Sequence, residues 1–254
     1  MPVSKRWRLW LGEFAVAMDR LHVTKLSPAA TASPLLNTAL LAVYARLRSE
    51  LETALILADA KRDMAFRNAC RSIIECALHI EMADGDPTYI DRLTEDDNVS
   101  RKGRAARFRK KQKLTPAADK TLSDFVLRLS DQKAKLQVSE YATVLPRLTH
   151  HYREISADTT HVSLTSIQRH VRPDRAGVDR LHIEPKFNWL EMEEASSLIA
   201  LSLLNATRVL LVRMPEIQRT TYLADLQRRY RALYEKGLRK LKREEQKIAA
   251  SGKP

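Results

Sequence analysis

The sequence predicts an all-α protein, an antiparallel helical bundle with a short irregular or extended excursion near residues 171–186. Only six of the 254 residues are glycine and 44% are hydrophobic, so the chain can bury a sizeable core. Good helix formers such as Leu, Ala, Arg, Lys and Glu are abundant. Apolar residues recur at helical spacing over most of the chain, and the short connections between these stretches favour antiparallel neighbours.

The first third of the chain contains three stretches with the helical period. The first helix is expected over residues 4–22, where Phe14 and two tryptophans fall at apolar positions. The second starts at Pro34, because proline is favoured in the first turn of a helix, and runs to about residue 58. The third runs over residues 64–82 and ends at the turn signal Asp-Gly-Asp-Pro, residues 84–87.

The middle of the chain is highly charged and has few large apolar residues. Residues 88–113 are expected to form one short helix followed by an exposed basic helix. The Thr-Pro pair at residues 115–116 predicts the start of another helix. A further helix is expected over about residues 139–157. Pro146 lies inside this pattern, so it either kinks the helix or marks a later start.

The last third contains the one expected departure from helical structure. Residues 171–186 combine Pro and Gly with alternating apolar positions, which is typical of extended structure such as a short hairpin. A buried helix is expected over residues 187–212, and a polar, basic helix over residues 216–249. The chain thus divides into an N-terminal helix and linker (1–32), a bundle core (33–215) with a charged insertion (88–115), and a basic C-terminal helix and tail (216–254).

Positive charge is concentrated in two segments of a chain whose net charge is +13. Residues 101–113 hold eight Lys or Arg and no acid, and residues 228–247 hold a surplus of six, so the remainder is near neutral at −1. Such clusters attract polyanions through phosphate contacts, which predicts salt-sensitive, sequence-independent binding of RNA or DNA. The alternative is a solvated, charged helix. The expected nucleic-acid-binding residues are Arg101, Lys102, Arg104, Arg107, Arg109, Lys110, Lys111 and Lys113.

Several classes of protein are disfavoured by the sequence. Cys70 and Cys76 point to different sides of one expected helix, which argues against a disulfide and fits a reducing cytoplasm. No Cys/His ligand spacing, Gly-rich phosphate loop or nucleophile elbow occurs, so neither a metal nor a cofactor is expected. The most apolar run, residues 198–212, is too short and too polar to span a bilayer. The expectation is a soluble, cytoplasmic protein that does not contact membranes.

The densest group of reactive side chains lies in residues 152–161. Tyr152 and Ser156 are four residues apart, so they share one face of a helix, and His161 follows where that helix is expected to end. A polar cluster beside a titratable histidine is typical of functional sites. His161 would act there as a general acid or base, or bind phosphate when protonated. The alternative is a histidine whose ring satisfies a buried hydroxyl or carbonyl.

A second polar group lies on the helix expected over residues 64–82. Arg71 and Glu75 are four residues apart on a helix that is apolar on most other sides. Because a charged stripe on a mostly buried helix needs partners, we expect this helix to lie beside the segment that contains Tyr152 and Ser156. The alternative is a solvated ion-pair ladder. The candidate catalytic residues are Arg71, Glu75, Tyr152, Ser156 and His161.

Two motifs in combination carry a family resemblance. They are Arg-Ser-x-x-Glu, which starts at Arg71, and Tyr-Arg-x-x-Ser-x-x-x-x-His, which starts at Tyr152. Over roughly residues 40–212 the chain resembles a bacterial helical family known as a domain of unknown function. That family is distantly similar to the HEPN superfamily, helical bundles whose nuclease members use an Arg-x(4–6)-His motif across a dimer. The resemblance therefore implies a helical bundle, a homodimer and a metal-independent ribonuclease site.

Functions of different classes are compatible with these features. One is a HEPN-like protein that binds RNA through its basic patches and carries a ribonuclease site. Another is a non-enzymatic interaction or regulatory protein, in which the same polar residues form a structural hydrogen-bond network. A third is binding of a nucleotide or small anion between the arginines and the histidine. Seven residues separate Arg153 from His161, one more than the nuclease motif has, so these alternatives stay open.

Overall fold

A computed structural model describes residues 3–22, 34–129, 136, 145–159, 164–174, 177–183, 185, 187–214 and 221–251. Within these ranges the chain forms nine helices and one two-stranded sheet, so the predicted all-α class is confirmed. The helices are α1 (Lys5–His22), α2 (Pro34–Asp59), α3 (Asp63–Gly85), α4 (Tyr89–Lys111), α5 (Pro116–Arg128), α7 (Pro146–Thr159), α8 (Leu164–Gln168), α9 (Trp189–Arg213) and α10 (Thr221–Ser251). The strands are β1 (Val171–Pro173) and β2 (Asp179–Leu181).

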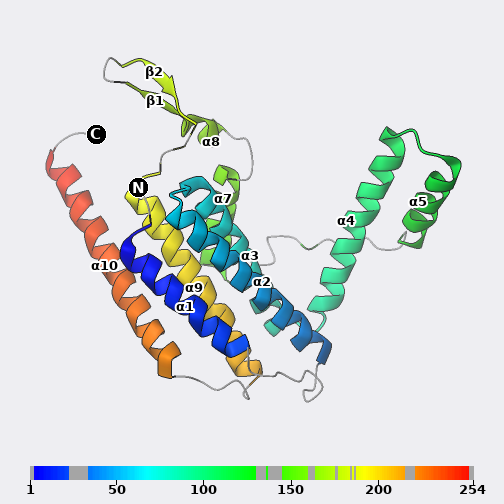
Figure 1. The fold of residues 1–254 in the computed structure, drawn as a ribbon, viewed down its shortest axis with the longest axis horizontal. Helices are drawn as coiled ribbons and strands as arrows, with labels where there is room; N and C mark the ends of the chain where they lie inside the picture. Colours follow the sequence, from blue (N-terminus) through cyan, green and yellow to red (C-terminus); the bar gives the residue numbers. More distant parts are fainter. Residues whose placement is uncertain are drawn as a thin grey trace.

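The bundle is organised around α3, which packs against α2, α9 and α7 (Figure 1). Helix α1 contacts α2, α9 and α10, and α10 also contacts α9. The N-terminal and C-terminal helices therefore belong to the same core as the helices between them. Its largest fully buried side chains include Trp7, Trp10 and Phe14 from α1, Phe66 from α3 and Phe187 from the turn before α9.

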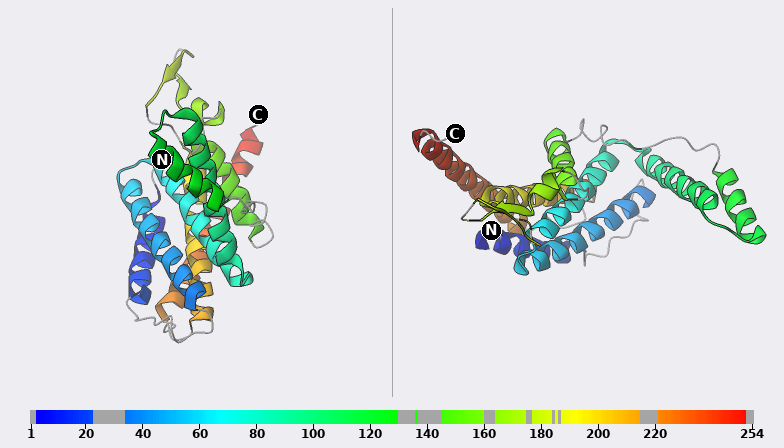
Figure 2. Two further views of the ribbon diagram at one scale, coloured as in Figure 1. Left: turned by 90° about the vertical axis from the view of Figure 1, so that its right-hand side faces the viewer. Right: turned by 90° about the horizontal axis from the view of Figure 1, so that it is seen from above.

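Helices α4 and α5 form an arm that projects away from the bundle (Figures 1 and 2). They pack against each other, and α4 makes few contacts with α3. No residue of α5 is fully buried, and in α4 only Tyr89 and Ala105 are. Helix α4 is continuous from Tyr89 to Lys111, so the expectation of a short helix followed by a separate basic helix is wrong. Its last turn is basic, which complements the negative end of the helix dipole.

Helix starts follow the proline and capping signals in the sequence. Helix α7 begins at Pro146, which selects the later start over a kink. At the start of α5, the Thr115 hydroxyl accepts a hydrogen bond from the Ala118 amide. Helix α9 begins with a capping box, in which Asn188 and Glu191 each accept a hydrogen bond from the other's backbone amide. The expected linker, which ends at residue 32, lies outside the described residues from residue 23 onward.

The excursion near residues 171–186 contains a short antiparallel hairpin, as the alternating pattern predicted. Val171 pairs with Leu181, and Pro173 pairs with Asp179. The turn uses Gly177 in the left-handed region at φ = 77°, where glycine avoids the strain of a side chain. The apolar residues of the alternating pattern, Val178, Leu181 and Ile183, are nonetheless exposed, Leu181 at 85%. The alternation therefore marks extended backbone here without marking a buried face.

Helix α9 is long and apolar enough, by composition, to cross a membrane. Two thirds of its most apolar window (67%) is buried by the surrounding helices of the bundle, as expected for the core helix of a soluble protein. Both cysteines are free and buried, and burial raises the pKa of each thiol to about 12. Each thiol is therefore protonated at neutral pH and weakly nucleophilic.

The buried carboxylate of Glu81 on α3 gives a pH-dependent prediction. Its side chain is 8% exposed, and Arg208 of α9 donates to its oxygens at 3.0 and 3.1 Å. Burial raises the pKa of Glu81 above its ordinary value of 4.5, although the charge and hydrogen bonds of Arg208 lower it. The folded state therefore holds this proton more tightly than the unfolded state. The protonated Glu81 carboxyl therefore stabilises the fold. This stabilisation is fully present below pH 4.5 and is lost as pH rises through the pKa that Glu81 has in the folded state.

The Glu81→Gln variant is expected not to lose stability in this way as pH rises, because its side chain does not titrate. The free energy of unfolding of the variant, relative to that of the wild type, should rise with pH above 4.5 and then level off. Urea unfolding at a series of pH values between about 4 and about 7 would measure this difference. A difference that does not change with pH would show that the carboxylate has the same pKa in the folded and unfolded states.

Candidate functional site

A hydrogen-bond network joins α3 to α7 at residues that the sequence motifs contain. The Arg71 guanidinium donates to the Tyr152 hydroxyl at 2.8 Å and to Ser156 Oγ at 3.2 Å. It also lies over the Tyr152 ring, 4.9 Å from the ring centroid, and its Nη1 is 3.7 Å from Glu75 Oε2. The prediction that the two motif segments lie side by side is therefore confirmed.

Helical spacing explains how these side chains meet. Arg71 and Glu75 lie one turn apart on α3, and Tyr152 and Ser156 lie one turn apart on α7. Helix α7 buries Tyr152 and Ile155 in the core, which holds this edge of the helix against α3. Each helix thus brings two polar groups to one crossing.

The network leaves little of Arg71 available to a ligand. Its guanidinium has a hydroxyl on each of two nitrogens, an aromatic ring beneath it and a carboxylate beside it. Burial raises the pKa of Tyr152, the negative charge of Glu75 raises it further, and Arg71 lowers it. The phenol therefore stays protonated at neutral pH while it accepts from Arg71. Such a mutually satisfied group holds two helices together, as buried polar groups require.

Arg153 and His79 lie near this network in the sequence, and each has other surroundings in the structure. His161, the fifth candidate catalytic residue, lies outside the described residues. Arg153, which precedes it in the motif, is exposed on α7. His79 follows Glu75 by one turn of α3, but its ring contacts the Tyr89 hydroxyl. Burial lowers the pKa of the His79 imidazole, so this ring is neutral at pH 7.

Sequence reasoning missed a second cluster, one turn earlier on α3. The buried guanidinium of Arg67 lies 5.1 Å from the centroid of the Phe187 ring, and that of Arg169 lies 4.3 Å from the same centroid. Arg169 forms an ion pair with Glu191 at 2.6 Å, and Arg67 donates to the Glu191 carbonyl at 3.3 Å. The capping-box pattern at the start of α9 was the available signal, because it fixes where Glu191 stands.

The predicted basic run occupies the outer half of α4 and the residues just after it, on the projecting arm. Arg101 and Arg109 have acidic partners on the arm. Arg101 pairs with Asp97 at 2.8 Å, and Arg109 donates two hydrogen bonds to the Asp119 carboxylate of α5. Five others are exposed, and no carboxylate of the described chain lies within 4.0 Å of them. These five residues are Arg104, Arg107, Lys110, Lys111 and Lys113. The surface that they form is called the basic arm.

A second basic surface lies where the C-terminal half of α10 passes the start of α1. Here the structure has a cleft of about 650 Å³. Its basic lining residues are all exposed, and its one acid, Glu193, accepts a hydrogen bond from the Trp7 indole at 2.6 Å. The Lys240 ammonium lies 3.6 Å from the centroid of the Trp189 ring. The basic lining residues are Lys5, Arg6, Lys236, Arg239, Lys240 and Arg243, and this surface is called the basic cleft.

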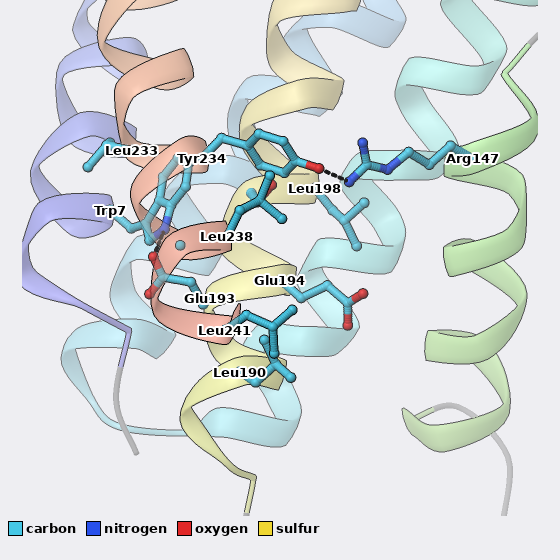
Figure 3. Close-up of a pocket in the computed structure, with 12 residues that line it drawn as sticks. Trp7, Arg147, Leu190, Glu193, Glu194, Leu198, Leu233, Tyr234, Leu238 and Leu241 are labelled. Atoms are coloured by element: carbon cyan, nitrogen blue, oxygen red, sulfur yellow. Dashed lines mark hydrogen bonds between the residues drawn. The ribbon is translucent and has the colours of Figure 1, made fainter. Parts of the chain in front are cut away.

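A smaller, mostly apolar cavity of about 130 Å³ lies beside this cleft, along the contact of α9 with α10 (Figure 3). Leu190, Leu198 and Leu238 point into it, and Arg147 closes one side by donating to the Tyr234 hydroxyl at 2.9 Å. Residues of the Arg71 network line neither this cavity nor the basic cleft. The polar network and the basic surfaces are therefore separate features of the molecule.

Over the described part of the chain, no group of three or more His, Cys, Asp or Glu side chains is placed to hold a metal ion. Compared with protein-family models, with curated proteins and with solved structures, the chain gives no match.

Proposed function

We propose that this protein binds nucleic acid, RNA or DNA, without sequence specificity, through the basic arm and the basic cleft. The exposure of the basic arm carries the proposal. Five exposed cations, from Arg104 to Lys113, lie on the last turns of α4 and just beyond its end, on an arm that projects from the bundle. In the described part of the chain no carboxylate lies within 4.0 Å of them. Holding like charges together on a protruding helix costs electrostatic free energy, which a row of phosphates would offset.

The mode of recognition is phosphate contact. Lysine and arginine on an exposed helix reach the backbone of a nucleic acid, and these contacts position the protein without reading bases. Phe108 is the one aromatic residue in the run, so stacking on several bases does not support sequence reading. Affinity should therefore depend steeply on salt and weakly on sequence.

In this proposal the Arg71 network is structural, and the protein is not a ribonuclease. The Arg71 guanidinium already contacts Tyr152, Ser156 and Glu75, and Tyr152 is buried and protonated at neutral pH. A catalytic arginine of a nuclease would instead have to meet a phosphate. We place the protein in the cytoplasm, which suits its free, buried cysteines and a nucleic-acid ligand.

Salt-dependent binding tests this proposal. A variant with four substitutions to glutamine removes four positive charges from the basic arm. Its affinity for a labelled RNA or DNA duplex is measured between about 50 and about 300 mM salt. For a duplex, each lost phosphate contact should reduce the slope of log affinity against log salt by about 0.9, so the loss of four contacts should reduce the slope by up to about 3.6. The substitutions are Arg104→Gln, Arg107→Gln, Lys110→Gln and Lys111→Gln.

A control variant that loses the same number of charges distinguishes an effect of the basic arm from an effect of net charge alone. It removes four cations of the bundle that lie outside both basic surfaces, and it should leave the salt slope almost unchanged. An equal loss of slope in both variants, or no loss in the arm variant, would contradict the proposal. The control substitutions are Arg20→Gln, Arg46→Gln, Lys61→Gln and Arg153→Gln.

A further inference from the structure

We infer that one copy of this protein bridges two separate nucleic-acid segments, one on the basic arm and one on the basic cleft. This inference rests on the proposed function, because it assumes that both surfaces bind phosphates. It adds a role that binding alone does not give. A protein with one continuous basic surface would hold one segment, whereas a protein with two distant surfaces can hold two.

The two surfaces lie at opposite ends of the molecule. With the longest axis horizontal, the arm of α4 and α5 occupies one end and α10 the other (Figure 1). The view from above shows the same separation, with the C-terminal part of α10 and the arm pointing in opposite directions (Figure 2). The bundle of α1, α2, α3, α7 and α9 lies between them.

The surface between the two patches does not continue them. The chain outside residues 101–113 and 228–247 has a net charge of −1. Some of its half-buried arginines form ion pairs with acids on neighbouring helices. Examples are Arg8 with Asp59 at 2.7 Å and Arg48 with Asp19 at 2.8 Å. A phosphate backbone that left one patch would therefore cross a neutral surface before it reached the other.

A short duplex cannot touch both patches. A duplex of about 12 bp is roughly 40 Å long, and DNA stays stiff over lengths of about 150 bp. Helix α4 alone is roughly 35 Å long, and the helices of the bundle separate it from α10. A duplex of that length seated on one patch cannot bend around the bundle to the other. Two patches at opposite ends therefore engage two duplexes.

Capture of one duplex by another tests the inference. A biotinylated duplex of about 12 bp is fixed on beads, and a fluorescent duplex of the same length and unrelated sequence is added with the protein. The wild type should retain the fluorescent duplex at low salt. At excess protein the signal should fall again, because each duplex then occupies its own copy.

Variants that keep one patch distinguish bridging from binding. The arm variant carries the four substitutions from Arg104 to Lys111 described above. A second variant, the cleft variant, neutralises four cations of the basic cleft. Each variant should still bind a single duplex, and each should lose at least tenfold in duplex capture relative to the wild type. The substitutions of the cleft variant are Lys236→Gln, Arg239→Gln, Lys240→Gln and Arg243→Gln. Lys236→Gln with Arg243→Gln, which leaves the contact between Lys240 and Trp189 in place, supplies the same test if the four-fold variant does not fold.

Each outcome decides between the alternatives. Binding without capture by the wild type would overturn the bridging inference and leave the proposed function standing. Absence of any binding would overturn the proposed function itself. Capture that survives in each single-patch variant, or that returns when the two variants are mixed, would assign bridging to a pair of copies and overturn the single-chain inference.

Discussion

Replacing Trp10 by alanine is expected to lower the free energy of unfolding by about 3–5 kcal/mol. The Trp10 side chain is 2% exposed, and its indole donates to the Leu226 carbonyl of α10 at 2.9 Å. Its ring also packs against Phe14, Trp7 and Tyr230. The substitution therefore opens a large cavity at the place where α1 holds α10. Since small proteins are stable by about 5–15 kcal/mol, the loss is a large share of the total.

Chemical denaturation measures the expected loss, and amide hydrogen exchange locates it. Exchange should accelerate first in α10, because its contact with α1 is weakened most. Leu9→Ala is the matched control: Leu9 lies on the same helix and is 55% exposed, so its loss should stay within about 0.5 kcal/mol. A cost below about 1 kcal/mol for Trp10→Ala, or equal exchange in all helices, would refute the role of α1 as the support of α10.

The Arg71 network gives the second large effect, a loss of about 2–3 kcal/mol in Arg71→Met. Methionine keeps the aliphatic stem over the Tyr152 ring but removes the donors to Tyr152 and Ser156. It also leaves the partly buried Glu75 without its cation. Tyr152→Phe keeps the ring and removes the hydroxyl, so it should cost about 1–2 kcal/mol. Because each substitution removes the same hydrogen bond, the double variant should lose less than the sum of the two.

This cycle also distinguishes a structural network from a catalytic site. Arg153→Met removes an exposed arginine from the same motif and should change stability by less than about 0.5 kcal/mol. If the network is structural, the effects of the Arg71 and Tyr152 substitutions on the free energy of unfolding should be coupled, and the wild type should not cleave RNA. Cleavage by the wild type that Arg71→Met abolishes, at unchanged stability, would instead establish the ribonuclease.

The helical spacing of apolar residues and the positions of proline explain why so much of the fold was predictable. Pro34, Pro146 and the Thr-Pro pair at residues 115–116 each mark an observed helix start, because a fixed φ angle and a missing amide suit the first turn. The charged middle was less predictable. Helix α4 runs without a break through a segment of weak apolar pattern, because α5 supplies the contacts that its own sequence does not reveal.

The candidate site was predictable to the extent that burial demands partners. Arg71 and Glu75 stand on an apolar helix, and that alone required polar residues opposite them, which Tyr152 and Ser156 supply. For the cluster around Phe187, the capping box predicted only where Glu191 stands. The contacts of Arg67 and Arg169 with the Phe187 ring were not predictable, because they join residues from three parts of the chain and ring contacts leave no spacing pattern in the sequence.

The sequence by itself determined the helical class, the helix starts at Pro34 and at the Thr-Pro pair of residues 115–116, and the two runs of positive charge, because each of these is a property of neighbouring residues. Only the tertiary structure decided that Arg67 and Arg169 contact the same Phe187 ring, that Lys5 and Arg6 join the α10 cations in one cleft, and that the two basic surfaces lie at opposite ends. These relations depend on how helices distant in the sequence pack together. That packing is set by the summed burial of many side chains, such as Trp7, Trp10 and Phe14, and no local pattern records the sum.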